Sequence, residues 1–143
     1  MKLNYGRLID DHARIQDIAD RLLSEVRRPN STATDLAHQL NALQFVVDEH
    51  LEVEHVIVGA CSELRMAKSW QELMRQGEAD FARLRADWGS FLSEWNEELI
   101  EADREGFRSA AEAILPRLHE RVDAETRALY ATGLQMGVIT LRG

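Results

Sequence analysis

The sequence predicts an all-α fold, an antiparallel up-down-up-down four-helix bundle, and three observations support this prediction. Apolar residues recur at the three- and four-residue spacing of an amphipathic helix in four long segments. Short polar stretches join these segments, and helices joined by short connections pack as antiparallel neighbours. No segment shows the strict alternation of apolar and polar residues that is typical of a half-buried strand.

The composition indicates one globular domain and excludes several classes of partner. With 45% apolar and 29% charged residues among 143, the chain is long enough to bury a proper core. The net charge of −8 argues against nucleic acid and against an anionic membrane surface as partners. The single Cys61 cannot form an internal disulfide, and neither a signal peptide nor a membrane-spanning apolar run is present. We therefore expect a cytoplasmic protein.

The first helix is expected over 5–26 and the second from about 32 to 61. His12 lies inside the apolar stripe of the first helix. This helix should end at the Arg-Arg-Pro run of 27–29, because cations suit a helix C-terminus and proline disfavours helical geometry in the residue before it. A serine or threonine within 31–34 can then cap the second helix.

The third helix is expected to begin at the capping-box pattern Ser-Trp-Gln-Glu of 69–72 and to continue to about Leu99. A turn over 100–103 follows, and Asp103 is the expected cap of the fourth helix. Pro116 falls within this fourth helix, where an interior proline removes one backbone hydrogen bond and usually causes a kink.

The end of the chain lacks a helical period. Gly133 can terminate the fourth helix, as glycine often does at a helix C-terminus. We therefore expect a helical bundle over 1–133 and a flexible or partner-bound tail over 134–143.

Several polar residues fall on helix faces that should be dry. His50 and Glu54 lie four residues apart on the apolar stripe of the second helix, one turn above each other. His12 and Glu125 occupy equivalent places on the first and fourth helices, and Arg121 lies on the inner flank of the fourth. Because a buried charge needs a partner or a metal, these five residues are the candidate site.

The other histidines are expected outside the site. His38 lies nearly opposite the apolar stripe of its helix, and His55 lies on the flank. His119 and Asp123 form a four-residue pair that points away from the core, unless Pro116 shifts the helical phase and turns His119 inward.

The inward polar residues resemble the ligands of the hemerythrin-like, or HHE cation-binding, domain, over roughly 5–132. The resemblance rests on these features: His12, the His50-x-x-x-Glu54 pair, Glu125 followed by Leu129-Tyr130, the tryptophan-containing third helix, and Asp103 with Phe107 at the start of the fourth. It implies a hemerythrin-like bundle in which two carboxylates bridge two irons. His12 and His50 would then serve one iron, with Glu54 and Glu125 as the bridges.

The sequence departs from that family at the second iron. No histidine occurs between His55 and His119, and Arg121 stands at the fourth-helix ligand position. The third-helix face carries Trp88 and other bulky apolar residues, which we expect to close the space there. We therefore expect a mononuclear site of His12, His50, Glu54 and Glu125, holding iron or alternatively zinc or manganese, with Arg121 as a charge substitute for the second metal.

Three functions stay open at this point. The first is a hemerythrin-like metal-binding protein that senses or binds iron, oxygen or nitric oxide. The second is a metal-free interaction module, for example a homodimer, in which Arg121 pairs with the former bridging glutamates Glu54 and Glu125. The third and weakest is an oxygen-activating enzyme, for which the sequence indicates no catalytic residue.

Overall fold

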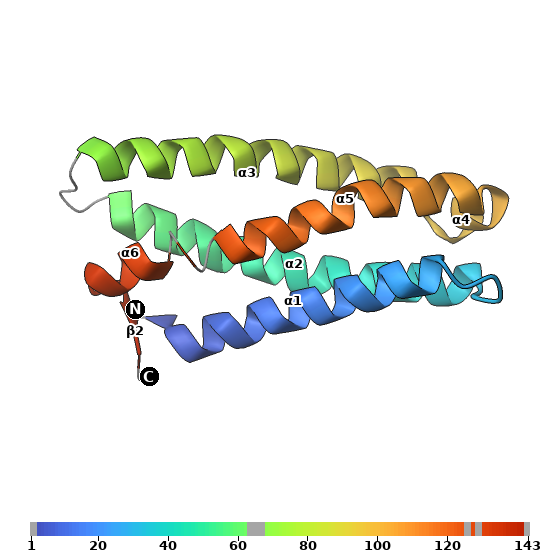
Figure 1. Cartoon of the computed structure of the whole chain (residues 1–143), viewed down its shortest axis with the longest axis horizontal. Coiled ribbons are helices and arrows are strands. Elements are labelled where there is room, and N and C mark those ends of the chain that lie inside the picture. The colour runs from blue at the N-terminus through green and yellow to red at the C-terminus, as the bar shows by residue number, and fades with distance from the viewer. Residues whose placement is uncertain (1–2, 63–67, 125–126, 128–129, 142–143) are drawn as a thin grey trace.

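The computed structural model consists almost entirely of helices, which confirms the predicted all-α class (Figure 1). It describes residues 3–62, 68–124, 127 and 130–141. The elements are, in order, β1 (Leu3–Asn4), α1 (Tyr5–Val26), α2 (Ala33–Ser62), α3 (Lys68–Glu94), α4 (Glu97–Ala102), α5 (Arg104–Ala124), α6 (Tyr130–Gln135) and β2 (Ile139–Thr140). The long helices α1, α2, α3 and α5 lie along the long axis of the molecule (Figure 1).

The first two helices have the predicted bounds because polar side chains cap them. The side-chain oxygen of Asn4 accepts a hydrogen bond of 3.0 Å from the backbone N–H of Arg7 at the start of α1. The hydroxyl oxygen of Thr32 accepts one of 3.1 Å from the N–H of Asp35 at the start of α2. Among the alternatives over 31–34, Thr32 is therefore the cap.

The predicted third helix is too long at its C-terminal end. It stops at Glu94, because the side chain of Asn96 accepts a 2.9 Å hydrogen bond from the N–H of Leu99 and starts the separate helix α4. The break changes which residue faces inward: Ile100 is fully buried, whereas Leu99 is 45% exposed. Asp103 caps α5 as predicted, since its carboxylate accepts a 2.9 Å hydrogen bond from the N–H of Gly106.

Pro116 lies inside α5 without changing which face of the helix is buried. Leu118 and Val122 follow the proline and remain buried, in phase with Phe107 and Ile114 before it. Pro116 therefore does not shift the helical phase, and His119 does not turn inward.

The end of the chain differs from the prediction. Gly133 does not end a helix but lies inside α6, which is closed by Gly137 with a φ of 77°. The N–H groups of Gly137 and Val138 donate to the carbonyls of Leu134 and Gly133, which is the Schellman pattern of a glycine-terminated helix.

Residues 136–141 form part of the fold, whereas the sequence predicted a flexible or partner-bound tail over 134–143. The strand β2 pairs in parallel with β1, with Ile139 opposite Leu3, and Ile139 is only 2% exposed. Both ends of the described chain therefore meet beside the start of α1 (Figure 1).

The buried apolar residues form two clusters. The larger cluster fills the space among α1, α2, α3 and α5, and α1 packs against both α2 and α5. The smaller cluster lies at the end of the molecule that holds the termini and contains Leu8, Ile57, Tyr130 and Ile139. Over the described residues, no helix combines the length and the apolar character that a membrane span requires.

Candidate functional site

Three of the predicted site residues are buried, which confirms that they point inward. His12 on α1 is 3% exposed, and His50 and Glu54 on α2 are each 4% exposed. They lie between the two apolar clusters, since the neighbouring turns of α1 and α2 contribute to the larger cluster on one side and the smaller on the other. The result is a polar layer inside an otherwise apolar core.

The two imidazoles face each other across the α1–α2 interface. Nε2 of His12 lies 3.2 Å from Nε2 of His50, and the ring centroids are 4.7 Å apart with the rings inclined by 68°. The two residues are 38 positions apart in sequence, so only the antiparallel pairing of α1 with α2 brings them together. The Nε2 atoms of the two rings are thus direct neighbours.

Tyr130 is a further member of the site that sequence reasoning did not select. Its hydroxyl oxygen lies 2.8 Å from Nε2 of His12, and its ring stacks on the imidazole at a centroid distance of 4.8 Å. Tyr130 is fully buried in the smaller apolar cluster. Its place five residues after Glu125 in the family resemblance was the signal that the sequence offered.

Arg121 on α5 forms an ion pair with Glu54, as the metal-free interpretation predicted. The carboxylate is 5% exposed and the guanidinium side chain 18% exposed, so the pair lies at the edge of the core. The guanidinium carbon also lies 4.5 Å from the ring centroid of Phe81 on α3, within the range of a cation–π contact. Glu54 Oε2 is 3.9 Å from Nε2 of His50, which connects the ion pair to the imidazoles.

The remaining candidates are placed as follows. Glu125 lies outside the residues that the structure describes. His38, His55 and His119 are exposed, as expected. Nδ1 of His119 lies 3.5 Å from Asp123, and both side chains are nearly half exposed, so this pair remains outside the site.

The separation of the two imidazole nitrogens fits a shared metal ion. Histidine nitrogens bind zinc and similar ions at about 2.0–2.1 Å, which places two of them roughly 2.8–3.4 Å apart for angles between right and tetrahedral. The observed 3.2 Å lies within that range. Imidazole with carboxylate or phenol oxygen is a donor set suited to iron, zinc or manganese.

The same residues do not form a complete ligand set. Within the described part of the chain, no three His, Cys, Asp or Glu side chains are grouped closely enough to hold a metal ion. Glu54 is turned toward Arg121, and the oxygen recorded beside His12 among the described residues is the hydroxyl of Tyr130.

Comparisons with protein-family models, with curated proteins and with solved structures find no match to this chain.

Proposed function

We propose that the protein binds a single metal ion between His12 and His50 and that its helices form a hemerythrin-like, up-down-up-down four-helix bundle. The observation that supports this most strongly is the 3.2 Å approach of the two buried Nε2 atoms from different helices. Iron is the metal that the family resemblance implies, and zinc or manganese suit the same donors.

The hydrogen-bonding capacity of imidazole favours a cation at this point. The Nε2 atom of His12 has two polar neighbours, His50 Nε2 and the hydroxyl of Tyr130. A neutral imidazole nitrogen carries either one proton or one lone pair, so it can form only one linear hydrogen bond in the ring plane. A metal ion would instead accept the lone pairs of both imidazoles at once.

Oxygen donors would complete the site. Glu54 is the nearest described carboxylate, and Glu125 is the second carboxylate that we assign to the site from the sequence. A bound iron would supply a centre for sensing or binding iron, oxygen or nitric oxide, as in the family that the sequence resembles. The chain's own contribution is to hold two imidazoles in a dry layer between two apolar clusters.

A second candidate is favoured by the ion pair between Arg121 and Glu54. Together with the contact between Tyr130 and His12, it gives Glu54 and His12 partners from the protein itself. In this version the bundle is a metal-free interaction module, and the guanidinium of Arg121 supplies the positive charge that a metal would otherwise provide. Buried networks of this kind can fix the register of packed helices.

Metal content decides between the two candidates. The protein should be purified without an affinity tag from iron-supplemented cells and measured by elemental analysis, absorption spectroscopy and thermal unfolding. We expect about one metal ion per chain and a higher melting temperature for the loaded protein, because a ligand that binds only the native state stabilises it. His12→Ala and His50→Ala should each abolish both effects, whereas His38→Ala, an exposed histidine on α2, should change neither.

The contrary result is equally specific. Absence of metal, with a melting temperature that added iron, zinc and manganese leave unchanged, would refute metal binding and support the interaction module. Arg121→His adds a third imidazole in place of the guanidinium and should raise the metal content if the charge of Arg121 limits it.

A further inference from the structure

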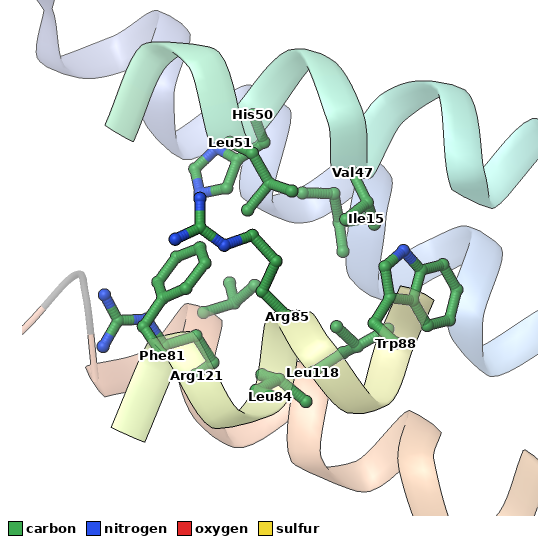
Figure 2. Close-up of a pocket in the computed structure, with 11 residues that line it drawn as sticks. Ile15, Val47, His50, Leu51, Phe81, Leu84, Arg85, Trp88, Leu118 and Arg121 are labelled. Atoms are coloured by element: carbon green, nitrogen blue, oxygen red, sulfur yellow. The ribbon is translucent and has the colours of Figure 1, made fainter. Parts of the chain in front are cut away.

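A pocket lies beside the polar layer, between α2, α3 and α5 (Figure 2). Its inner part has a volume of about 30 Å³ and is lined mainly by apolar side chains, together with His50, Arg85 and Arg121. Val47 and Leu51 contribute from α2, Leu84 and Trp88 from α3, and Leu118 from α5. The bulky residues of α3 therefore do not close this space completely, in contrast to the expectation from the sequence.

A larger outer hollow adjoins the inner part. This hollow has a volume of about 340 Å³ and shares Leu51, Phe81, Arg85 and Arg121 with the inner part. Over the described residues, α3 packs more closely on α5 than on α2, and the hollow lies on the looser α2 side. Figure 2 shows Trp88 at one end of the pocket and Phe81 with both guanidinium groups toward the other.

The outer hollow carries an excess positive charge. Arg121 is paired with Glu54, whereas Arg85 forms no ion pair with any described residue, and its guanidinium carbon lies 5.4 Å from the centroid of the Phe81 ring. A guanidinium held against an aromatic ring keeps its N–H groups available in a planar fork that matches a carboxylate.

We propose that this pocket binds a small organic monocarboxylate with an unbranched apolar tail. The carboxylate would pair with Arg85 in the outer hollow, and the end of the tail would enter the inner part toward Trp88. The inner volume has room for about two methylene-sized groups, so most of the tail would lie along Leu51 and Phe81. Binding of this ligand does not depend on a metal at His12 and His50.

The chemistry of the pocket favours this ligand class over other anions. A phosphate or nucleotide carries more than one negative charge, whereas Arg85 is the single cation here that lacks an ion pair among the described residues. Such a ligand would also leave the apolar inner part unfilled. Each buried methylene adds to the binding free energy, so the tail supplies affinity that a small inorganic anion lacks.

Octanoate is a suitable probe, titrated calorimetrically into the chelator-treated protein. We expect saturable binding of about one molecule per chain, with butyrate weaker because its tail is shorter. Arg85→Gln should weaken octanoate binding about tenfold, since it removes a charge-assisted hydrogen bond. Arg21→Gln is the matched control: Arg21 is an exposed arginine on α1 that pairs with Asp17 at 3.1 Å, and its loss should leave the affinity unchanged.

Three results would each overturn the proposal. They are the absence of saturable octanoate binding, an unchanged affinity in Arg85→Gln, and equally tight binding of 1-octanol, which has the tail without the charge. Because Arg85 is exposed and is not part of the core, its substitution should leave the fold intact, and circular dichroism of the variant checks this. Metal content is measured separately, so failure here leaves the proposed metal site untouched.

Discussion

The hydroxyl oxygen of Tyr130 lies 2.8 Å from Nε2 of His12, across 118 positions of sequence. This contact joins the C-terminal helix α6 to the middle of α1 and connects the smaller apolar cluster to the polar layer. It also means that the region around the imidazoles depends on how the end of the chain is packed.

Tyr130→Phe tests the energetic contribution of this contact. The phenylalanine ring can keep the stacking on His12 but loses the hydroxyl group, so we expect a loss of about 1 kcal/mol in the free energy of unfolding. Urea denaturation of the metal-free protein measures it. Tyr5→Phe, at the half-buried start of α1, is the control, and equal effects in the two variants would contradict a specific role for the hydroxyl of Tyr130.

Arg121→Ala should destabilise the metal-free protein by roughly 2 kcal/mol. It removes the ion-pair partner of a carboxylate that is 5% exposed; we expect less than the 3–5 kcal/mol typical of a broken buried pair because the Arg121 side chain is 18% exposed. Arg117→Ala, which removes an exposed arginine paired with Asp87 at 2.8 Å, should change stability by much less.

A double-mutant cycle isolates the interaction energy between Arg121 and Glu54. If Arg121 stabilises the fold by compensating the charge of Glu54, then Glu54→Gln should recover much of the stability that Arg121→Ala loses. Purely additive losses in the double variant would mean that Arg121 acts through its packing on Phe81 and not through the carboxylate.

Ile139→Ala should cost about 2–4 kcal/mol, because the side chain is 2% exposed and belongs to the smaller apolar cluster. Leu141→Ala is the control: Leu141 lies two residues further along and is 71% exposed, so its loss should be close to neutral. Thermal or urea unfolding of both variants measures the difference. Equal, small effects would support the loose tail that the sequence predicted.

The ion-pair cluster at Glu112 makes stability depend on pH in a defined direction. Hydrogen bonds from Arg27 and then Arg108 lower the pKa of the Glu112 carboxyl below its ordinary value of 4.5. A group whose pKa is lower in the folded state stabilises that state above the ordinary pKa, and this contribution disappears as the pH falls through the lowered pKa. Glu112→Gln should therefore be less stable than wild type at pH 7 and converge with it in strong acid.

The measurement is a series of urea midpoints from neutral to acid pH. Glu120→Gln, another exposed glutamate on α5, should show no such convergence. A constant difference between Glu112→Gln and wild type at every pH would exclude ionisation of Glu112 as the cause.

Sequence periodicity predicted the helices that have a continuous apolar stripe and failed where local hydrogen bonds interrupt it. The stripe of α1 placed His12 in the core, and the stripe of α2 did the same for His50 and Glu54. Asn96 could not be identified as a helix cap in this way, because the apolar pattern continues through Trp95 to Leu99.

The prediction for the C-terminal region failed for a different reason. The buried position of Ile139 comes from parallel pairing with a strand 136 residues away, as the register Leu3 to Ile139 shows, and no local pattern encodes such a contact. Tyr130 depends on the same packing, so the sequence indicated the imidazoles of the site but not the phenol beside them.

The pairing of Leu3–Asn4 with Ile139–Thr140 determines how the molecule would respond to a mechanical load. Because the two strands are parallel and belong to opposite ends of the chain, pulling the ends apart draws them along each other in opposite directions. The ladder bonds would then be loaded together, in shear, before any helix extends. Once the two strands have separated, the force would act on α6 and pull the phenol of Tyr130 away from His12. The first rupture under tension would therefore remove one of the side chains that pack against the buried imidazoles.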